Sequence, residues 1–246
     1  MWKTIGMTRP DAQAHLRLFG TGLRPCPYLH DRPSQFDFVD PRLTPTPALY
    51  DELLTQGFRR GGEHVYRTAC PGCQACQSLR IPVAEFTPRR RHRRCLRDNA
   101  DVELVNVGFR FDPAHFALYD RYVRARHPGG GMDEADPDLY WQYLTASWCP
   151  TEFLEMRLAG QLLGVAVTDD TGGALSAVYT FFDPDLPRRS LSTLAILLQI
   201  EEARRRQREW LYLGYWIAGL AGMSYKAGFR PHERLTSMGW EPVPAS

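Results

Sequence analysis

Three strand-like segments followed by one long helical pattern constrain the fold of this chain more than any other feature. The segments, residues 152–158, 162–168 and 175–182, alternate or run apolar and are joined by Ala159-Gly160 and by residues 169–173. Such closely spaced runs predict an antiparallel meander. Residues 190–209 then place leucines on one face and arginines on the other, which predicts an amphipathic helix. The fold class predicted from this order is α+β.

Further elements flank this part of the chain. Strands are predicted over residues 102–111, 210–215 and 235–240, and a short helix over 217–226. Asp112-Pro113 and Asp136-Pro137 each predict the start of a helix, because aspartate caps a first turn that proline fits. The glycines at 129–131 predict a flexible hinge or a ligand-approach loop between these two helices.

This order of elements is similar to the GNAT-type acyltransferase core, in which two central parallel strands splay apart. In that fold the acyl donor lies at the start of the long helix. A coenzyme A user has a glycine-rich loop there, because backbone amides must approach the pyrophosphate. The corresponding residues here, Arg188-Arg189-Ser190-Leu191-Ser192-Thr193, include no glycine. Coenzyme A is therefore disfavoured as the donor, which argues against an N-acetyltransferase.

The first hundred residues predict a smaller α+β part. Residues 15–19 suggest an edge strand, Thr46-Pro47 a helix start, and residues 79–83 a strand with an edge-type proline. We predict an N-terminal domain over residues 1–101 and a GNAT-like acyl-transfer domain over 102–246. The N-terminal domain as a second, degenerate GNAT-like unit is left open.

Positive charge is concentrated in one segment. The chain carries +2 overall, but residues 59–97 hold ten arginines and two glutamates, hence +8, which leaves −6 for the remainder. A basic patch on an otherwise acidic protein indicates a defined contact with a polyanion. The run Arg89–Arg94 cannot be buried and is predicted to flank a groove. A solvated arginine-rich loop is the alternative.

Four of the six cysteines invite a metal interpretation. Cys70-x-x-Cys73-x-x-Cys76, with Cys26 as a fourth ligand, has the number and type of ligands for zinc or an iron–sulfur centre. The spacing is tight for one ion, so a redox-sensitive, thiol-lined turn is the alternative. No signal-peptide pattern and no bilayer-length apolar run occur, which predicts a cytoplasmic protein without a membrane partner.

Several motifs carry a resemblance to a known family. In the first half they are Cys26-Pro-Tyr28-Leu29, Gly57-Phe58-Arg59-Arg60-x-Gly62, Tyr66-Arg67, Cys70-x-x-Cys73-x-x-Cys76 and Arg80-Ile81-Pro82-Val83. In the second half they are Tyr179-x-Phe181-Phe182-Asp183-Pro184, Leu194-x-Ile196-Leu197-x-Gln199-Ile200, Tyr212-Leu213-Gly214-Tyr215-Trp216-Ile217 and Met223-x-Tyr225-Lys226-x-x-Phe229-x-Pro231-x-Glu233. With them the chain resembles the aminoacyl-tRNA–protein transferases, most closely the bacterial aspartate/glutamate leucyltransferases, over about residues 10–242.

Two positions depart from the family pattern. Arginyl-transferring relatives have a second cysteine where Leu29 stands, and are implicated in iron–sulfur binding, so this departure weakens the iron–sulfur interpretation. Glycine is expected where Ser192 stands, which predicts a tighter start of the long helix.

The resemblance implies an activity and its partners. Leucine passes from leucyl-tRNA to the α-amine of a protein that begins with Asp or Glu, and the product enters N-degron proteolysis. The chemistry is ester aminolysis, which needs a positioned amine, a proton acceptor and oxyanion stabilisation, and no cofactor is required. Arginyl transfer, or a non-catalytic RNA-binding module with a thiol-bound metal, are the alternatives.

The resemblance also suggests site residues. The catalytic candidates are Asp183, Tyr179 and Tyr212, supported by Lys226 and Glu233. The residues expected to bind the acidic N-terminus of the acceptor protein are Arg59, Arg60, Tyr66 and Arg67. The tRNA is assigned to Arg89, Arg90, Arg91, Arg93 and Arg94. The leucyl pocket is assigned to Phe181, Tyr215, Trp216 and Ile217. For Asp183 the alternative is a turn, and for Tyr212 or Tyr215 it is simple packing. For Lys226 the alternative is an ordinary surface lysine, and for Arg59 and Arg60 it is ordinary loop charges.

Overall fold

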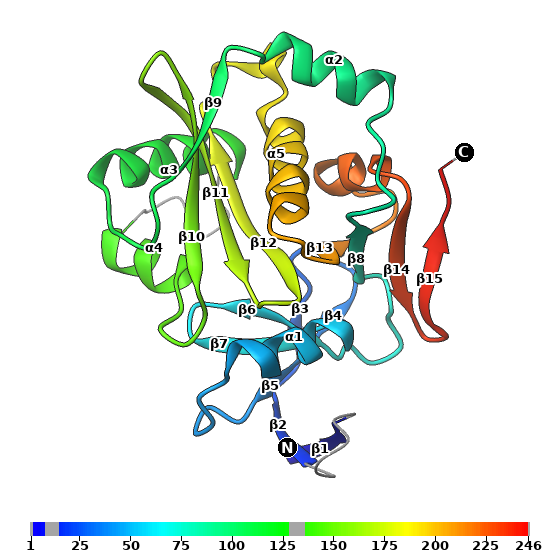
Figure 1. Cartoon of the computed structure of the whole chain (residues 1–246). Helices are drawn as coiled ribbons and strands as arrows, with labels where there is room; N and C mark the ends of the chain where they lie inside the picture. The colour runs from blue at the N-terminus through cyan, green and yellow to red at the C-terminus, as the bar shows by residue number, and fades with distance from the viewer. Residues whose placement is uncertain (1, 8–14, 128–135, 246) are drawn as a thin grey trace.

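A computed structural model describes residues 2–7, 15–127 and 136–245 and contains two main sheets (Figure 1). The smaller sheet has the order β1 (Trp2–Gly6), β2 (His15–Gly20), β5 (Phe36–Val39), β7 (His64–Thr68) and β6 (Arg59–Gly61). A short ribbon, β3 (Arg24–Pro25) with β4 (Pro33–Ser34), and the helix α1 (Pro47–Thr55) complete this part. Thr46 caps α1 and Pro47 opens it, as predicted.

The larger sheet has eight strands. Its order is β15 (Gly239–Val243), β14 (His232–Thr236), β8 (Gln77–Pro82), β13 (Trp210–Trp216), β12 (Ala174–Phe182), β11 (Gln161–Asp170), β10 (Thr151–Leu158) and β9 (Val102–Asn106). Every neighbouring pair is antiparallel except β12 and β13. The predicted meander is therefore confirmed, since β10, β11 and β12 follow one another in sequence and in the sheet.

The two parallel strands separate along their length. β12 and β13 pair only where residues 174–176 lie beside residues 210–212, and beyond Ser176 their ladder ends. The helix α5 (Leu191–Arg205), which follows the 3-10 turn η1 (Pro187–Arg189), packs against both strands (Figure 1). The α+β class and the GNAT-like arrangement of meander, long helix and splayed strands are thus confirmed.

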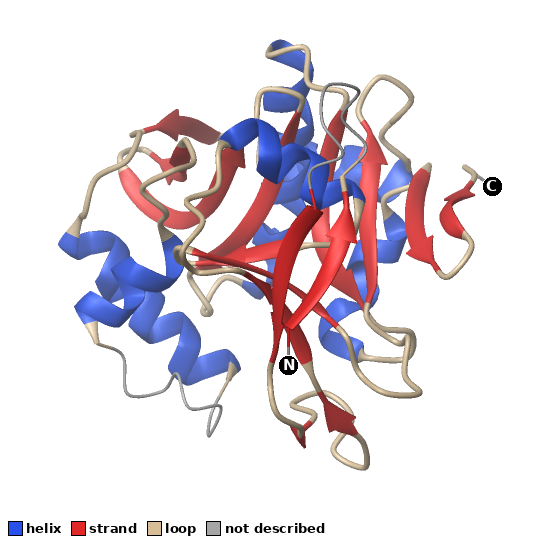
Figure 2. Cartoon of the chain, turned by 90° about the horizontal axis from the view of Figure 1, so that it is seen from below, coloured by secondary structure: helices blue, strands red, loops and turns tan. Residues whose placement is uncertain are grey.

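Helices cover both faces of the meander. Leu154 of β10 packs in the same buried cluster as the apolar face of α5. Its neighbour Phe153 packs in another cluster, with residues of α3 (Pro113–Arg126) and α4 (Pro137–Leu144). Because successive side chains of a strand point to opposite faces, α5 lies on one face, and α3 and α4 on the other. α3 and α4 lie beside one another (Figure 2). The Tyr140 ring of α4 contacts the rings of Phe116 and Tyr119 of α3.

The arginine run, for which the sequence predicts exposure but no element, is a helix, α2 (Arg90–Asp98), whose buried side chains are His92 and Cys95. Some predicted elements are wrong. The last strand, predicted over residues 235–240, is a hairpin whose turn falls between β14 and β15. The short helix predicted over 217–226 is a 3-10 segment, η2 (Ala221–Gly228). Pro82 is not on an edge strand, because β8 lies between β13 and β14. It is the last residue of β8.

The larger sheet draws on both predicted domains. β8 comes from the first hundred residues, yet it lies in the middle of a sheet built otherwise from residues after 101. The division at residue 101 therefore stays a prediction. The glycine run at 129–131 lies outside the described residues. Among the residues that are described, no helix is both long and apolar enough to cross a bilayer.

Candidate active site

A cavity of about 750 Å³ opens where the central strands separate. Its walls come from β12, the start of α5 and η2, with Arg59 of β6 and the end of α3 closing the remaining sides. The ionisable lining includes Arg59, Arg126, His127 and Lys226, whereas the described lining residues include no aspartate or glutamate. The cavity is therefore an electropositive pocket at the point where a GNAT-like fold places its acyl donor.

Arg59 is held in the cavity by a glycine. Gly214 has a φ of +70°, and a Cβ added there would lie 2.3 Å from Cζ of Arg59, so no side chain fits. The guanidinium lies 5.3 Å from the ring centroid of Tyr215 and donates to the Val178 carbonyl at 3.5 Å. In the described part of the chain no carboxylate forms a salt bridge with Arg59, which is half-buried. Its positive charge therefore has no carboxylate partner among the described residues and can bind an anionic group.

Lys226 lines the same cavity. Its Nζ donates to the carbonyls of Leu213 at 2.8 Å and Tyr215 at 3.0 Å. A bulge between Tyr212 and Gly214 interrupts the pairing of β13 with β8 next to these carbonyls. Burial disfavours the charged amine and Arg59 repels it, which together lower the pKa of Lys226 to about 7. The amine is therefore neutral in a large fraction of molecules at physiological pH.

Several tyrosines line the cavity, among them Tyr28, Tyr143, Tyr179 and Tyr225. Burial raises the pKa of Tyr225 to about 12 and raises the pKa of Tyr179 still further. Their hydroxyls therefore stay protonated at neutral pH, and can donate hydrogen bonds to a developing negative charge.

The neighbour of Arg59 has a different role. The Arg60 side chain is fully buried and forms a bidentate salt bridge with Asp169, through Nε at 2.6 Å and Nη2 at 2.7 Å. Nη2 also donates to the Leu144 carbonyl. Arg60 is buried and does not line the cavity, so the structure gives it a structural role, in which it joins β6 to β11 of the larger sheet, in place of the predicted contact with the acceptor protein.

Three predicted catalytic residues, Tyr212, Glu233 and Asp183, lie away from the cavity lining. The first two contact Arg80, whose guanidinium stacks between the rings of Trp210 and Trp240, at 3.7 and 4.1 Å from their centroids. It donates to Glu233 at 2.6 and 2.8 Å and to the Tyr212 hydroxyl at 3.2 Å. Asp183 accepts from Arg121 and from the backbone N–H of Asp185, both at 3.0 Å. It therefore stabilises a turn, which is the alternative role given for it above. Only Tyr179 and Lys226 of the predicted catalytic set line the cavity.

The predicted leucyl pocket is not assembled. Phe181 is fully buried among the aromatic rings on the α3 side of the sheet, and Trp216 lies under the guanidinium of Arg234. Tyr215 and Ile217 are buried, and the Tyr215 hydroxyl donates to the Gly57 carbonyl. The apolar cavity lining instead comes from Ala177, Phe182, Leu186, Leu191, Ile196 and Leu213. Sequence patterns could not reveal this set, because it depends on where the parallel strands separate.

The remaining predicted acceptor residues lie outside the cavity lining. Arg67 stacks on Phe58 at 4.8 Å and lines a second cavity of about 420 Å³. The Tyr66 ring packs on Phe36 and Phe38 at 5.7 and 5.4 Å. Of the four predicted acceptor-binding residues, the structure brings only Arg59 to the main cavity.

The basic helix α2 lies close to the cavity. Arg90, Arg91, Arg93 and Arg94 are exposed and Arg89 is half-buried. A Cβ added at Gly228 would lie 1.3 Å from Nη2 of Arg91, so α2 packs directly on η2, which carries Lys226. Burial, together with repulsion from Arg89 and Arg230, lowers the pKa of Arg91. Arg91 therefore connects the basic helix α2 to the segment that carries Lys226.

The four candidate thiols lie near one another but do not form a ligand set. Burial and the thiols of Cys70, Cys26 and Cys73 raise the pKa of Cys76 to about 11. Within the described residues, however, no three of the four Sγ atoms lie within 4.8 Å of one another. Cys70 accepts from the Gln35 amide and Cys73 from Arg32. As arranged, the thiols do not fit a shared metal ion.

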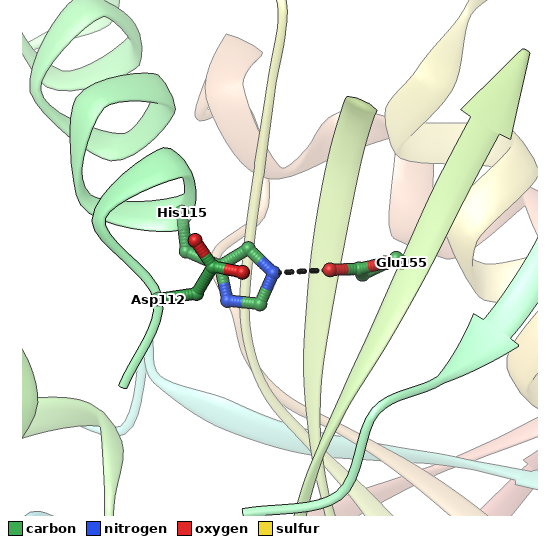
Figure 3. Close-up of side chains that lie close together, drawn as sticks. All are labelled: Asp112, His115 and Glu155. Atoms are coloured by element: carbon green, nitrogen blue, oxygen red, sulfur yellow. Dashed lines mark hydrogen bonds and ion pairs between the residues drawn. The ribbon is translucent and has the colours of Figure 1, made fainter. Parts of the chain in front are cut away.

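One other cluster has metal-ligand geometry (Figure 3). His115 and Asp112, at the start of α3, lie beside Glu155 of β10, and His115 Nε2 is 2.6 Å from Glu155 Oε1. Arg157 already donates to the other Glu155 oxygen at 2.5 Å, and Asp112 caps α3 through the Ala114 amide. Burial acts to raise the pKa of Glu155, but hydrogen bonds from Arg157 and His115 outweigh it and lower that pKa. Arg157 thus supplies the local cation, and the cluster fastens α3 to the sheet.

Two family models and several curated proteins match this sequence. The family model "Arginine-tRNA-protein transferase, N terminus" matches residues 24–94, and its C-terminal counterpart matches residues 114–236. An aspartate/glutamate leucyltransferase of Alkalilimnicola ehrlichii is 48% identical over 238 residues, which cover 96% of this chain and all of the relative. One from Stenotrophomonas maltophilia K279a is 50% identical over 236 residues, covering 94% of each chain.

The solved structures are more distant. A tandem GNAT protein from the clavulanic acid biosynthesis pathway matches with 13% identity and a TM-score of 0.44, over all of this chain and 65% of that one.

Proposed function

The chain belongs to the arginine-tRNA-protein transferase family, and on this premise we propose that it transfers leucine from leucyl-tRNA to proteins that begin with Asp or Glu. Sequence identity of 48% and 50% to aspartate/glutamate leucyltransferases, over nearly the full length, supports leucine as the donor group and an acidic N-terminal residue in the acceptor. Because leucyl-tRNA is the donor, we expect the reaction in the cytoplasm, where the product would enter N-degron proteolysis.

The observation that carries the proposal is the cavity with cationic side chains and no described acidic residue in its lining. An acceptor with N-terminal Asp or Glu would supply the missing carboxylate. Arg59 is the residue for this contact, because its guanidinium is oriented by Tyr215 and Gly214 and has no carboxylate partner in the described chain. A neutral Asn or Gln would leave the cation without its charge partner.

The reaction forms an amide bond and breaks an ester bond. The acceptor α-amine attacks the leucyl carbonyl, its nitrogen bonds to that carbon, and the 3′ oxygen of the tRNA leaves and takes up a proton. Neutral Lys226 is suited to accept the proton from the ammonium: its two N–H groups donate to Leu213 and Tyr215, which leaves its lone pair free. The Tyr179 hydroxyl is a donor for the oxyanion.

Two further contacts complete the substrate complex. The apolar lining around Ile196 and Leu213 suits the leucyl side chain. The exposed arginines of α2 suit the phosphates of the acceptor stem, since α2 packs on η2 beside the cavity. No step is assigned to the thiols, whose arrangement does not fit a metal ion.

The direct test is a transfer assay with the purified protein. Radiolabelled leucyl-tRNA is incubated with a peptide that begins with Asp, and label is expected in the peptide. The same peptide beginning with Asn, and an N-acetylated Asp peptide, serve as controls that should stay unlabelled. Arginyl-tRNA is offered in parallel to test the arginyl alternative. No labelled peptide from leucyl-tRNA, with an active relative as control, would refute the proposal.

A further inference from the structure

A buried amide on α5 has one end without a partner. Gln199 is 1% exposed, lines the cavity, and donates from Nε2 to the Thr168 hydroxyl at 2.7 Å. Among the described residues, its Oε1 has no hydrogen-bond partner. A buried acceptor without a partner is costly, and native structures contain few of them. This orphan oxygen therefore calls for a ligand.

The orientation of this amide is fixed by its anchor. The Thr168 hydroxyl has one proton, which it donates to the Ala166 carbonyl at 3.3 Å. With its proton on the Ala166 carbonyl, Thr168 accepts from Gln199, so the nitrogen of the amide is turned to Thr168 and the oxygen away from it. A flipped amide would require the Thr168 proton to leave the Ala166 carbonyl. Gln199 thus presents a preorganised acceptor.

The position of Gln199 along α5 indicates which part of the substrate it meets. Ile196 lies about one turn before it, and Leu191 about two turns before it, on the same side of the helix, and all three line the cavity. The lining includes no carboxylate among the described residues, and Lys226 is already assigned to the acceptor amine, so Gln199 is the side-chain amide that remains for the amine of the donor. An apolar wall followed by a single amide acceptor is complementary to a side chain next to an amino group.

We propose that Gln199 Oε1 accepts an N–H hydrogen bond from the α-amino group of the leucyl ester, while Ile196 contacts the leucyl side chain. This inference rests on the proposed leucyl transfer and adds how the site reads the donor. Gln199 is a specificity-determining residue: it favours esters of α-amino acids over acyl esters that lack the amino group. Thr168 is a positioning residue, because it acts only through the amide of Gln199.

The experiment pairs two donors with four variants. The donors are leucyl-tRNA and 4-methylpentanoyl-tRNA, which has the same acyl chain without the amino group. For the native chain, kcat/KM with leucyl-tRNA should exceed that with the desamino donor by roughly 10- to 100-fold, the range of one hydrogen bond to a charged or strongly polar group. In Gln199→Met, which keeps the shape but lacks the acceptor, most of this preference should disappear. Gln199→Glu keeps an acceptor, and Thr168 can anchor the carboxylate by donating its hydroxyl proton to it, so this variant should retain the preference.

Two further variants complete the design. Thr168→Val leaves Gln199 in place without its anchor and should reduce the preference in part. Gln161→Met, the same substitution at an exposed position of β11, should leave it unchanged. Because the preference is a ratio measured within each variant, differences in the amount of folded protein cancel.

The outcomes separate the two proposals. If the native chain transfers leucine but uses both donors equally well, or if Gln199→Met keeps the full preference, the role of Gln199 is wrong and leucyl transfer stands. Equal loss of preference in Gln199→Glu and Gln199→Met would likewise overturn it, because shape alone would then decide. Failure of the native chain to transfer leucine from leucyl-tRNA would overturn both.

Discussion

Two adjacent arginines on one short strand show how residue identity and residue role diverge. Arg59 and Arg60 are successive residues of β6, so their side chains point to opposite sides. Arg60 meets Asp169, 109 positions away in the chain, and is neutralised by it. Arg59 meets the cavity instead. The sequence motif predicts that this pair matters, but which member is free depends on a contact that no local pattern contains.

At this scale the charge of Arg59 should select the acceptor. Arg59→Met keeps the bulk of the side chain and removes its charge. We expect kcat/KM for a peptide that begins with Asp to fall roughly 10- to 100-fold, because a charge-assisted hydrogen bond is removed, while leucyl-tRNA binding changes little. Steady-state kinetics with Asp- and Asn-initiated peptides, and filter binding of the tRNA, check this. Arg17→Met, at an exposed arginine of β2, is the control. Equal weakening of both substrates would contradict the assignment.

Lys226 gives the site a pH dependence. Since burial and Arg59 lower its pKa to about 7, the neutral, proton-accepting form grows as pH rises. We expect kcat/KM to rise with pH around an inflection near 7. In Arg59→Met the inflection should move to higher pH, because a neighbouring cation is removed. A profile measured from pH 5.5 to 9, with Lys226→Met as the control that lacks the inflection, tests this. A rate that falls with pH would exclude Lys226 as the base.

The same residue links stability to pH. The folded pKa lies near 7 and the ordinary lysine value is 10.5, so the unfolded chain binds more protons between these values. The contribution of Lys226 to the free energy of unfolding should therefore increase as pH rises from about 7 to 10.5. Denaturant unfolding across this window should show the increase in the native chain and a smaller one in Lys226→Met. Parallel curves would argue against a depressed pKa.

At the scale of elements, sequence patterns succeed where the periodicity is strong. The meander and α5 follow from runs of apolar residues, and the caps of α1, α3 and α4 from Thr or Asp before Pro. α2 escapes this approach because only His92 and Cys95 face inward, so its amphipathic signal is carried by arginines. The apolar side of the cavity escapes it as well. It includes Ile196 of α5 and Leu213 of β13, which line one cavity because the strands splay.

The role of α2 can be tested through its salt dependence. In a variant with Arg90, Arg93 and Arg94 changed to Gln, the helix keeps good formers but loses three exposed charges. Binding of leucyl-tRNA should weaken, and the slope of log K against log salt should flatten by about 0.7 to 0.9 for each phosphate that is no longer neutralised. A variant with Arg17, Arg110 and Arg205 changed to Gln, which removes three exposed charges outside α2, is the matched control. An unchanged slope would place the tRNA elsewhere.

At the scale of the whole molecule, one buried ion pair joins the two sheets. The bridge from Arg60 to Asp169 connects β6 of the smaller sheet to β11 of the larger one. Because Arg59 is also a residue of β6, the bridge fixes the position of Arg59 relative to the larger sheet. Removing one partner leaves an uncompensated buried charge. We expect Asp169→Ala to lower the free energy of unfolding by about 3 to 5 kcal/mol, measured by denaturant titration. Arg60→Met combined with Asp169→Leu should cost less than Asp169→Ala alone. A larger loss in the double variant would contradict this explanation.

The place of β8 bears on how such proteins can exchange parts. This strand belongs to the first stretch of the chain, yet it separates β13 from β14 and pairs with both. A hybrid of two relatives joined near residue 101 would therefore combine a middle strand from one parent with neighbours from the other. Arg80 of one parent would then have to stack on Trp210 and Trp240, and bind Glu233, of the other parent. A junction in the turn at residues 70–76 keeps β8 with its partners, so recombinants that fold should cross over there.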